Sequence, residues 1–138
     1  MPIQPAGARD VSGKAIIFDE YIDGLKDLEG FSHIILLYHF HKSQQYDLQV
    51  TPFLDNDKRG LFSTRAPNRP NGIGLSIVEL VAIEGNRLLL QGTDMLNQTP
   101  LLDIKPYVPA FDAHPDADTG WLARSNGDIS RLSDDRFR

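Results

Sequence analysis

FSHIILLYHFH, residues 31–41, carries the clearest structural signal in the sequence. From residue 34 onward apolar or aromatic residues fill its even positions, while its odd positions mix apolar residues with histidines. This two-residue period is typical of a β-strand, and so is the high content of β-branched and aromatic residues. The pattern therefore predicts a strand with one apolar face, which consists of Ile34, Leu36, Tyr38 and Phe40.

Shorter strand patterns surround this segment on both sides. We expect strands at residues 15–18, 49–53, 75–83, 88–91 and 101–107. Pro52 confines its strand to a sheet edge or a strand end. Residues 84–87, EGNR, are typical of the turn of a β-hairpin between two of these strands.

One segment, residues 19–28, has a helical pattern instead. Its apolar face would consist of Tyr21, Ile22, Leu25 and Leu28, and Gly30 is suited to the C-terminal cap. Many strands and one short helical pattern favour a mainly β fold over a doubly wound α/β fold. We predict a small antiparallel β-barrel with one or two short helices.

Composition sets the limits on the class of protein. The chain has 138 residues, 41% of them hydrophobic, a net charge of -5 and no cysteine. This fits one domain over residues 1–138 with a polar tail from about residue 112. The absence of cysteine excludes thiol nucleophiles, iron–sulfur clusters and disulfides. The longest apolar run, residues 34–38, is too short to span a membrane, so we expect a soluble, cytoplasmic protein.

Positive charge gathers in one loop, KRGLFSTRAPNRPNGIG, residues 58–74. It holds four cations and no carboxylate, although the protein as a whole is acidic. Two prolines fix its backbone, Gly72 and Gly74 permit close backbone approach, and its arginines offer planar donors for an anion or a base. A shaped pocket for an anion or nucleotide is the reading we favour, and an ordinary loop with solvated arginines is the alternative.

The histidines of residues 31–41 raise the question of a metal. His39 and His41 point to the same side of the predicted strand and could share a metal with His114 or a carboxylate. No recognisable ligand spacing supports this, so we expect no metal site and interpret His41 as a neutral hydrogen-bonding residue of a ligand pocket. The roles of His33 and His39 stay open.

Three separated motifs resemble the TrmO family, also called YaeB-like. They are EGFSH at residues 29–33, TRAPNRPNGIG at 64–74 and TPLLDIKPY at 99–107. The resemblance covers residues 2 to about 111 and implies a homodimeric β-barrel enzyme. It further implies that S-adenosylmethionine donates a methyl group to N6 of threonylcarbamoyladenosine next to the tRNA anticodon.

The resemblance assigns roles to residues of this chain. The implied cofactor pocket is lined by Ile3, Gln4, Pro5, His41, Lys42, Arg65, Leu75, Asp94, Met95, Leu96 and Asn97. The tRNA anticodon arm would be bound by Lys58, Arg59, Arg69, Asn71 and Tyr107. Arg65 would hold the cofactor carboxylate and Arg69 the RNA. For catalysis the candidate is Lys105, oriented by Asp103, and a structural ion pair at a strand is an equally open alternative.

The sequence departs from the family pattern in several places. We expect the family's first strand to be missing, which would expose a sheet edge that a second copy could cover. Gly72 stands where the family commonly has proline, Asn97 and Gln98 replace Asp-Gly, and Lys42 replaces glutamine. These departures keep a second hypothesis open: a module that binds S-adenosylmethionine or RNA without catalysis.

Overall fold

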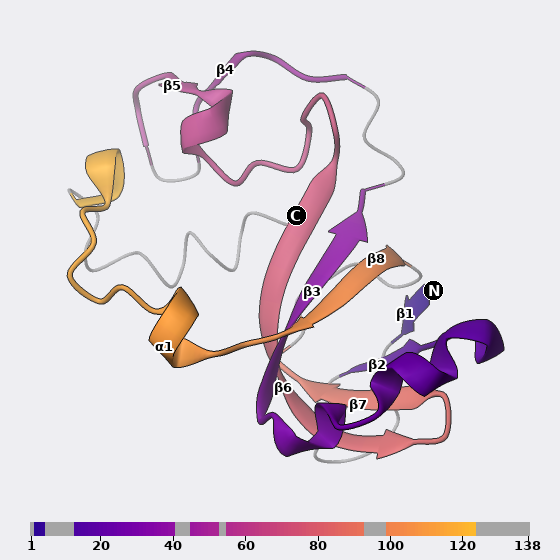
Figure 1. The fold of residues 1–138 in the computed structure, drawn as a ribbon. Helices are drawn as coiled ribbons and strands as arrows, with labels where there is room; N and C mark the ends of the chain where they lie inside the picture. The colour runs from indigo at the N-terminus through magenta and orange to yellow at the C-terminus, as the bar shows by residue number, and fades with distance from the viewer. Residues whose placement is uncertain (1, 5–12, 41–44, 53–54, 93–98, 124–138) are drawn as a thin grey trace.

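The computed structural model describes residues 2–4, 13–40, 45–52, 55–92 and 99–123, and these consist mainly of β-strands (Figure 1). The strands are β1 (Pro2–Gln4), β2 (Gly13–Ile16), β3 (His33–His39), β4 (Gln49–Val50), β5 (Arg59–Gly60), β6 (Ile73–Glu84), β7 (Arg87–Gln91) and β8 (Thr99–Pro106). The helical segments are η1 (Asp19–Leu25), η2 (Leu28–Gly30) and η3 (Leu61–Ser63), which are 3-10 helices, and the α-helix α1 (Pro109–Asp112).

Six strands pair in the order β1-β2-β7-β6-β3-β8, and all pairs are antiparallel. The strand β1 pairs with both β2 and β8, so the order returns to its start. The predicted mainly β, antiparallel class with few helices is confirmed. The edge that we expected to be exposed is occupied by β1, and the absence of a family strand before it stays a prediction.

The core lies on the inner face of this sheet. The predicted apolar face of residues 31–41 is confirmed, because Ile34, Leu36 and Tyr38 are 0% exposed and Phe40 is buried beside them. Facing strands contribute Ala15, Val78, Leu80, Leu88, Leu90 and Leu101. Each fully buried aliphatic side chain contributes roughly 1.5–3 kcal/mol, so this layer accounts for much of the stability of the sheet.

Tyr38 occupies the tightest part of the core. Its hydroxyl forms a buried hydrogen bond of 2.8 Å with the Oγ of Ser76 on β6. Its ring lies edge-on to Phe40 and directly over Gly74, its partner in the β3–β6 register. The close approach that we expected at Gly74 is made by the Tyr38 ring, which occupies the space that a Cβ on Gly74 would need.

The predicted helix at residues 19–28 is correct in place but wrong in type. Two 3-10 helices, η1 and η2, occupy it, and Asp27 between them has a left-handed backbone with φ 69°. Of its predicted apolar face only Leu25 is buried, and Tyr21 is exposed. So small a buried face stabilises a full α-helix poorly. Gly30 is also not the cap, because it lies inside η2 and Phe31 ends that helix.

The remaining predicted strands are confirmed with shifted bounds. The predicted strand 15–18 appears earlier, as β2. The hairpin of β6 and β7 turns at Gly85 and Asn86, and Gly85 has the φ of 63° that such a turn requires. The predicted strand 49–53 is reduced to β4, and residue 53 lies outside the described residues.

The chain after β8 is not a polar tail alone. It begins with the short helix α1 and then runs away from the sheet toward η3 and the separate two-stranded sheet of β4 and β5 (Figure 1). Residues 124–138 lie outside the described part, so the polar tail stays a prediction. No helix among the described residues is long and apolar enough to cross a membrane.

Candidate functional site

Two rows of side chains cross the outer face of β6, β3 and β8. In the first row, Leu75 lies opposite Leu37, which lies opposite Asp103. Residues that are directly opposed in antiparallel strands point to the same side of the sheet. The register therefore brings the predicted cofactor residue Leu75 and the predicted catalytic residue Asp103 onto one face, two strands apart.

The second row repeats this arrangement, with Ile77 opposite Ile35 and Ile35 opposite Lys105. The Nζ of Lys105 lies 3.2 Å from the Oδ2 of Asp103, so the two predicted catalytic groups form an ion pair at the border of the face. Both side chains are more than half exposed. They are therefore accessible to a bound molecule.

The face beside this ion pair is apolar and open. On β6, Ile73, Leu75 and Ile77 are 50%, 47% and 48% exposed, and Ile35 and Leu37 on β3 are half-buried. A contiguous exposed apolar patch on a soluble protein marks an interaction site more often than single exposed residues do. This surface, defined by Ile35, Leu37, Ile73, Leu75 and Ile77, is called the outer apolar face below.

A groove with a volume of about 620 Å³ lies between η1, η2 and β8. Its lining includes three aromatic side chains, Phe18, Tyr21 and Phe31, all of which are exposed. Asp103 also lines it, the only residue to do so among the predicted site residues that the structure describes. Asp103 thus borders both the groove and the row that contains Leu75.

The basic loop is organised largely by its own side chains. Arg69 donates from Nη1 to the carbonyl oxygens of Thr64 at 2.9 Å and Ala66 at 3.0 Å, and its guanidinium lies 5.8 Å from the ring centroid of Phe62. Arg65 is exposed and forms no hydrogen bond or ion pair with any residue in the described ranges. Arg69 thus supports the loop, whereas Arg65 keeps its donors for a ligand.

This geometry changes the expected effects of the two arginines. Arg65→Ala should weaken binding of S-adenosylmethionine about 10- to 100-fold, the usual cost of a charged hydrogen bond. Arg69→Ala should weaken both cofactor and tRNA binding, because it frees the carbonyls on either side of Arg65. Calorimetry with the cofactor and fluorescence anisotropy with tRNA measure the two effects. Unchanged cofactor affinity in Arg69→Ala would restore the division of roles expected from the sequence.

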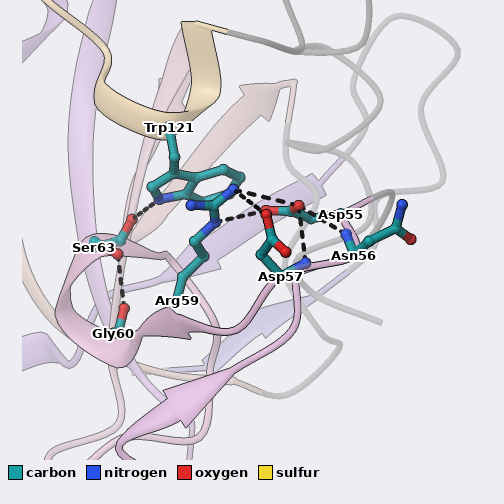
Figure 2. A network of polar contacts seen from close by, with 7 residues as sticks. All are labelled: Asp55, Asn56, Asp57, Arg59, Gly60, Ser63 and Trp121. Carbon is teal, nitrogen blue, oxygen red and sulfur yellow. Dashed lines mark hydrogen bonds and ion pairs between the residues drawn. The ribbon is translucent and has the colours of Figure 1, made fainter.

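Arg59 is bound within the protein, although the sequence suggested a contact with RNA. Its Nε donates to Asp55 Oδ2 at 2.8 Å, and its Nη2 lies 3.5 Å from Asp57 Oδ2. On its other side the guanidinium carbon lies 5.3 Å from the ring centroid of Trp121 (Figure 2). Two carboxylates thus offset the charge of Arg59. Among the described residues of this loop, Lys58 and Arg65 are the cations that stay free to bind an anion.

The ion pair between Arg59 and Asp55 predicts a change in this part of the protein at acidic pH. Hydrogen bonding from Arg59 lowers the pKa of Asp55 below its ordinary value of 3.8. A lowered folded-state pKa adds stability above the ordinary value, which is lost as the pH falls through the lowered pKa. The emission of Trp121, the only tryptophan, should therefore change only below pH 3.8. Asp55→Asn should lack this step, and an identical step in that variant would contradict the assignment.

The other predicted residues fall into two groups. Ile3 and Gln4 lie in β1, while Pro5, His41, Lys42 and residues 94–97 lie outside the described residues. Of the predicted RNA contacts, Asn71 is exposed, and the ring of Tyr107 packs edge-on against His33 at 6.4 Å. No group of three potential metal ligands occurs among the residues that the structure describes.

The residues expected from the sequence did not include Trp121, Phe62 or the carboxylate partners of Arg59. Trp121 lies in the segment that we interpreted as a loop and polar tail, yet its Nε1 donates to the carbonyl oxygen of Ser63 at 2.9 Å. Phe62 is 74% exposed beside the arginines. The spacing of Asp55 and Arg59, four residues apart, was a usable signal for their ion pair. A lone tryptophan in a polar segment was the corresponding signal for Trp121.

The chain is similar to proteins whose names refer to S-adenosylmethionine binding or to tRNA methylation. The chain is 48% identical over 135 residues to a probable S-adenosyl-L-methionine-binding protein of Pyrococcus abyssi. The aligned residues cover 98% of this chain and 73% of that protein. It is 43% identical to the human tRNA (adenine(37)-N6)-methyltransferase over 70% of this chain, but it spans only 23% of the human protein.

Solved structures agree with these relatives. TrmO from Pseudomonas aeruginosa matches with a TM-score of 0.68 and 36% identity, over 86% of this chain and 58% of that one. This chain therefore spans a little more than half the length of that protein. The family model of the tRNA-methyltransferase O N-terminal domain matches residues 1–113, most of the described chain. The chain belongs to this family, TrmO_N.

Proposed function

We propose that this protein is a cytoplasmic methyltransferase that methylates N6 of threonylcarbamoyladenosine next to the tRNA anticodon. S-adenosylmethionine would supply the methyl group on a reactive sulfonium, for which positioning supplies much of the catalysis. The names of the relatives support the cofactor and the adenine N6. We further propose that the closed order of six strands is the small barrel of YaeB-like proteins.

The observation that carries this proposal is the position of Asp103. It shares a row with Leu75 on one side and lines the aromatic groove on the other. An adenine that is modified at N6 must leave its stack, and exposed aromatic rings can hold such a base. The groove would therefore hold the acceptor base, and the outer apolar face would hold the cofactor.

The described residues suit the chemical groups of the cofactor. An adenine ring needs an apolar surface, which the half-exposed Leu75 and its neighbours on the outer apolar face provide. A carboxylate needs a fork of donors, and the exposed Arg65 offers one. Of the remaining proposed contacts, Ile3 and Gln4 lie in β1, whereas residues 5, 41, 42 and 94–97 lie outside the described part of the chain.

A homodimer is a second element of the proposal. The outer apolar face carries five apolar side chains on two neighbouring strands, and a second copy would remove from water the apolar surface that the cofactor leaves exposed. This support replaces the exposed sheet edge, which β1 occupies. Light scattering at micromolar concentration measures the mass, and the mass of a monomer would contradict the homodimer.

The alternative is a module that binds S-adenosylmethionine without catalysis. The name of the relative from Pyrococcus abyssi, which states only binding, favours it. Transfer of a labelled methyl group to tRNA that carries threonylcarbamoyladenosine separates the two. Label in the tRNA supports the enzyme, binding by calorimetry without transfer supports the module, and the absence of both refutes the two hypotheses together.

A further inference from the structure

The segment after β8 returns to the basic loop and contacts it through one side chain. Trp121 donates from its indole Nε1 to the carbonyl oxygen of Ser63, and its ring covers the guanidinium of Arg59 (Figure 2). The hydrogen bond joins residues 58 positions apart in the chain. Its donor, Trp121, lies beyond residue 113, where the match to the family model ends, whereas its acceptor, Ser63, lies within that match.

Arg59 is also held by a carboxylate. Asp55 holds its Nε at 2.8 Å, and the second oxygen of that carboxylate accepts the backbone N–H groups of Asn56 at 2.8 Å and Asp57 at 3.2 Å. The guanidinium thus contacts both a carboxylate and an aromatic ring. Both contacts are favourable for a planar cation, and together they leave it little freedom.

These contacts reach the residues that would meet the RNA. Ser63 ends η3, and its Oγ donates to Gly60 O at 2.8 Å; the next residue, Thr64, accepts from Arg69. Lys58 adjoins Arg59, and Arg65 follows two residues after Ser63. The strands available to shape this loop, β4 and β5, have only two residues each. Side-chain contacts must therefore supply much of its order.

We propose that Trp121 is a positioning residue that holds the basic loop in the conformation that binds tRNA. The proposal rests on the proposed function and adds a C-terminal segment outside the family match to the substrate-binding machinery. Arg59 then serves the RNA indirectly, because its charge is already offset by Asp55 and Asp57. An ordered loop binds more tightly than a free one, because less conformational entropy is lost on binding.

Two variants of Trp121 test this role. Trp121→Ala removes both the hydrogen bond and the ring, whereas Trp121→Phe keeps a ring over Arg59 and loses only the N–H donor. Phe111→Ala is the matched control, because Phe111 lies on α1 in the same segment, is 76% exposed and makes none of these contacts. Thermal unfolding of all three variants verifies that each is folded.

The readouts are the Kd for a fluorescent anticodon stem-loop RNA, by anisotropy, and the KM and kcat of methyl transfer to tRNA. Trp121→Ala should raise Kd and KM about tenfold, from one lost hydrogen bond and one lost cation–π contact. We expect kcat at saturating tRNA to stay within about twofold, because a positioning role affects binding and not the chemical step. Trp121→Phe should lie between wild type and Trp121→Ala, and Phe111→Ala should equal wild type.

Wild-type Kd in Trp121→Ala would overturn the inference, and so would a lower kcat with an unchanged KM. Equal losses in Phe111→Ala would also overturn it, because the effect would then belong to the whole segment. The binding series needs no turnover, so it tests Trp121 even if wild-type protein transfers no methyl group. If Trp121→Ala unfolds, the folded Trp121→Phe variant provides the test. A wild-type Kd and KM in Trp121→Phe would refute the role of the indole N–H.

Discussion

Gly74→Ala is expected to lower the free energy of unfolding by about 1–3 kcal/mol, the usual cost of overpacking a core. A Cβ on Gly74 would lie 2.6 Å from the Cζ of Tyr38, far inside van der Waals contact. Tyr38 cannot move aside easily, because it is 0% exposed and its hydroxyl is bonded to Ser76. Denaturant unfolding of wild type and variant, at equal m-values, measures the loss.

Gly60→Ala is the matched control. A Cβ at Gly60 meets nothing within 4 Å, and the backbone there has φ -60°, which alanine adopts without strain. Its stability should stay within about 1 kcal/mol of wild type. In a Tyr38→Ala background the clash is absent, so Gly74→Ala should then cost much less. An equal cost in both backgrounds would contradict the clash as its cause.

Local periodicity predicted the central strands because they bury one face completely. The buried positions of β3 alternate with half-buried and exposed ones along its whole length, and those of β6 do the same up to Leu80, although the exposed positions of β6 are largely apolar as well. A period of two residues can be recognised in a sequence only where one face of the strand is buried and the other is not. The segment of η1 buries only Leu25, so its pattern fitted an α-helix as well as the 3-10 helix that forms.

The site depends on features that local patterns do not contain. The family motifs assigned roles to Leu75 and Asp103, but the register of β6, β3 and β8 decides that they share a face. That register includes an irregularity between Leu37 and Tyr38, next to the pairing with Asp103. A shift of one residue would move Asp103 to the inner face. The family motifs thus identify Leu75 and Asp103, but they do not show that the two residues lie on the same face of the sheet.

The charge of the basic loop shows a second limit. Counting residues 58–74 alone gave an uncompensated cationic segment. In the structure Asp55 and Asp57, just before that window, bind Arg59. Trp121 completes the contact from a distant part of the chain. Contacts with residues outside the segment therefore decide which of its cations stay unpaired. The net charge of residues 58–74 alone does not show this.

Lys105→Met is expected to lower kcat for methyl transfer at least about 100-fold, the lower range for a positioned acid–base or electrostatic group. The acceptor nitrogen must lose a proton as it gains the methyl group, and a cation next to it would stabilise the charge that develops. Lys105 is suited to this role because Asp103 holds its Nζ at 3.2 Å beside the groove. The Kd for S-adenosylmethionine and the KM for tRNA should change little, since the interaction forms in the transition state.

Stability separates this role from that of a structural ion pair. Asp103 and Lys105 are both more than half exposed, and exposed pairs contribute about 0–1 kcal/mol, so Lys105→Met should unfold near the wild-type temperature. Lys14→Met on β2, which removes a lysine elsewhere on the sheet, should keep wild-type kcat. Asp103→Asn should lower kcat less than Lys105→Met, because it leaves the cation in place but loosely held. If kcat in Lys105→Met stays within a few-fold of wild type, the pair is structural and another group must assist the proton transfer.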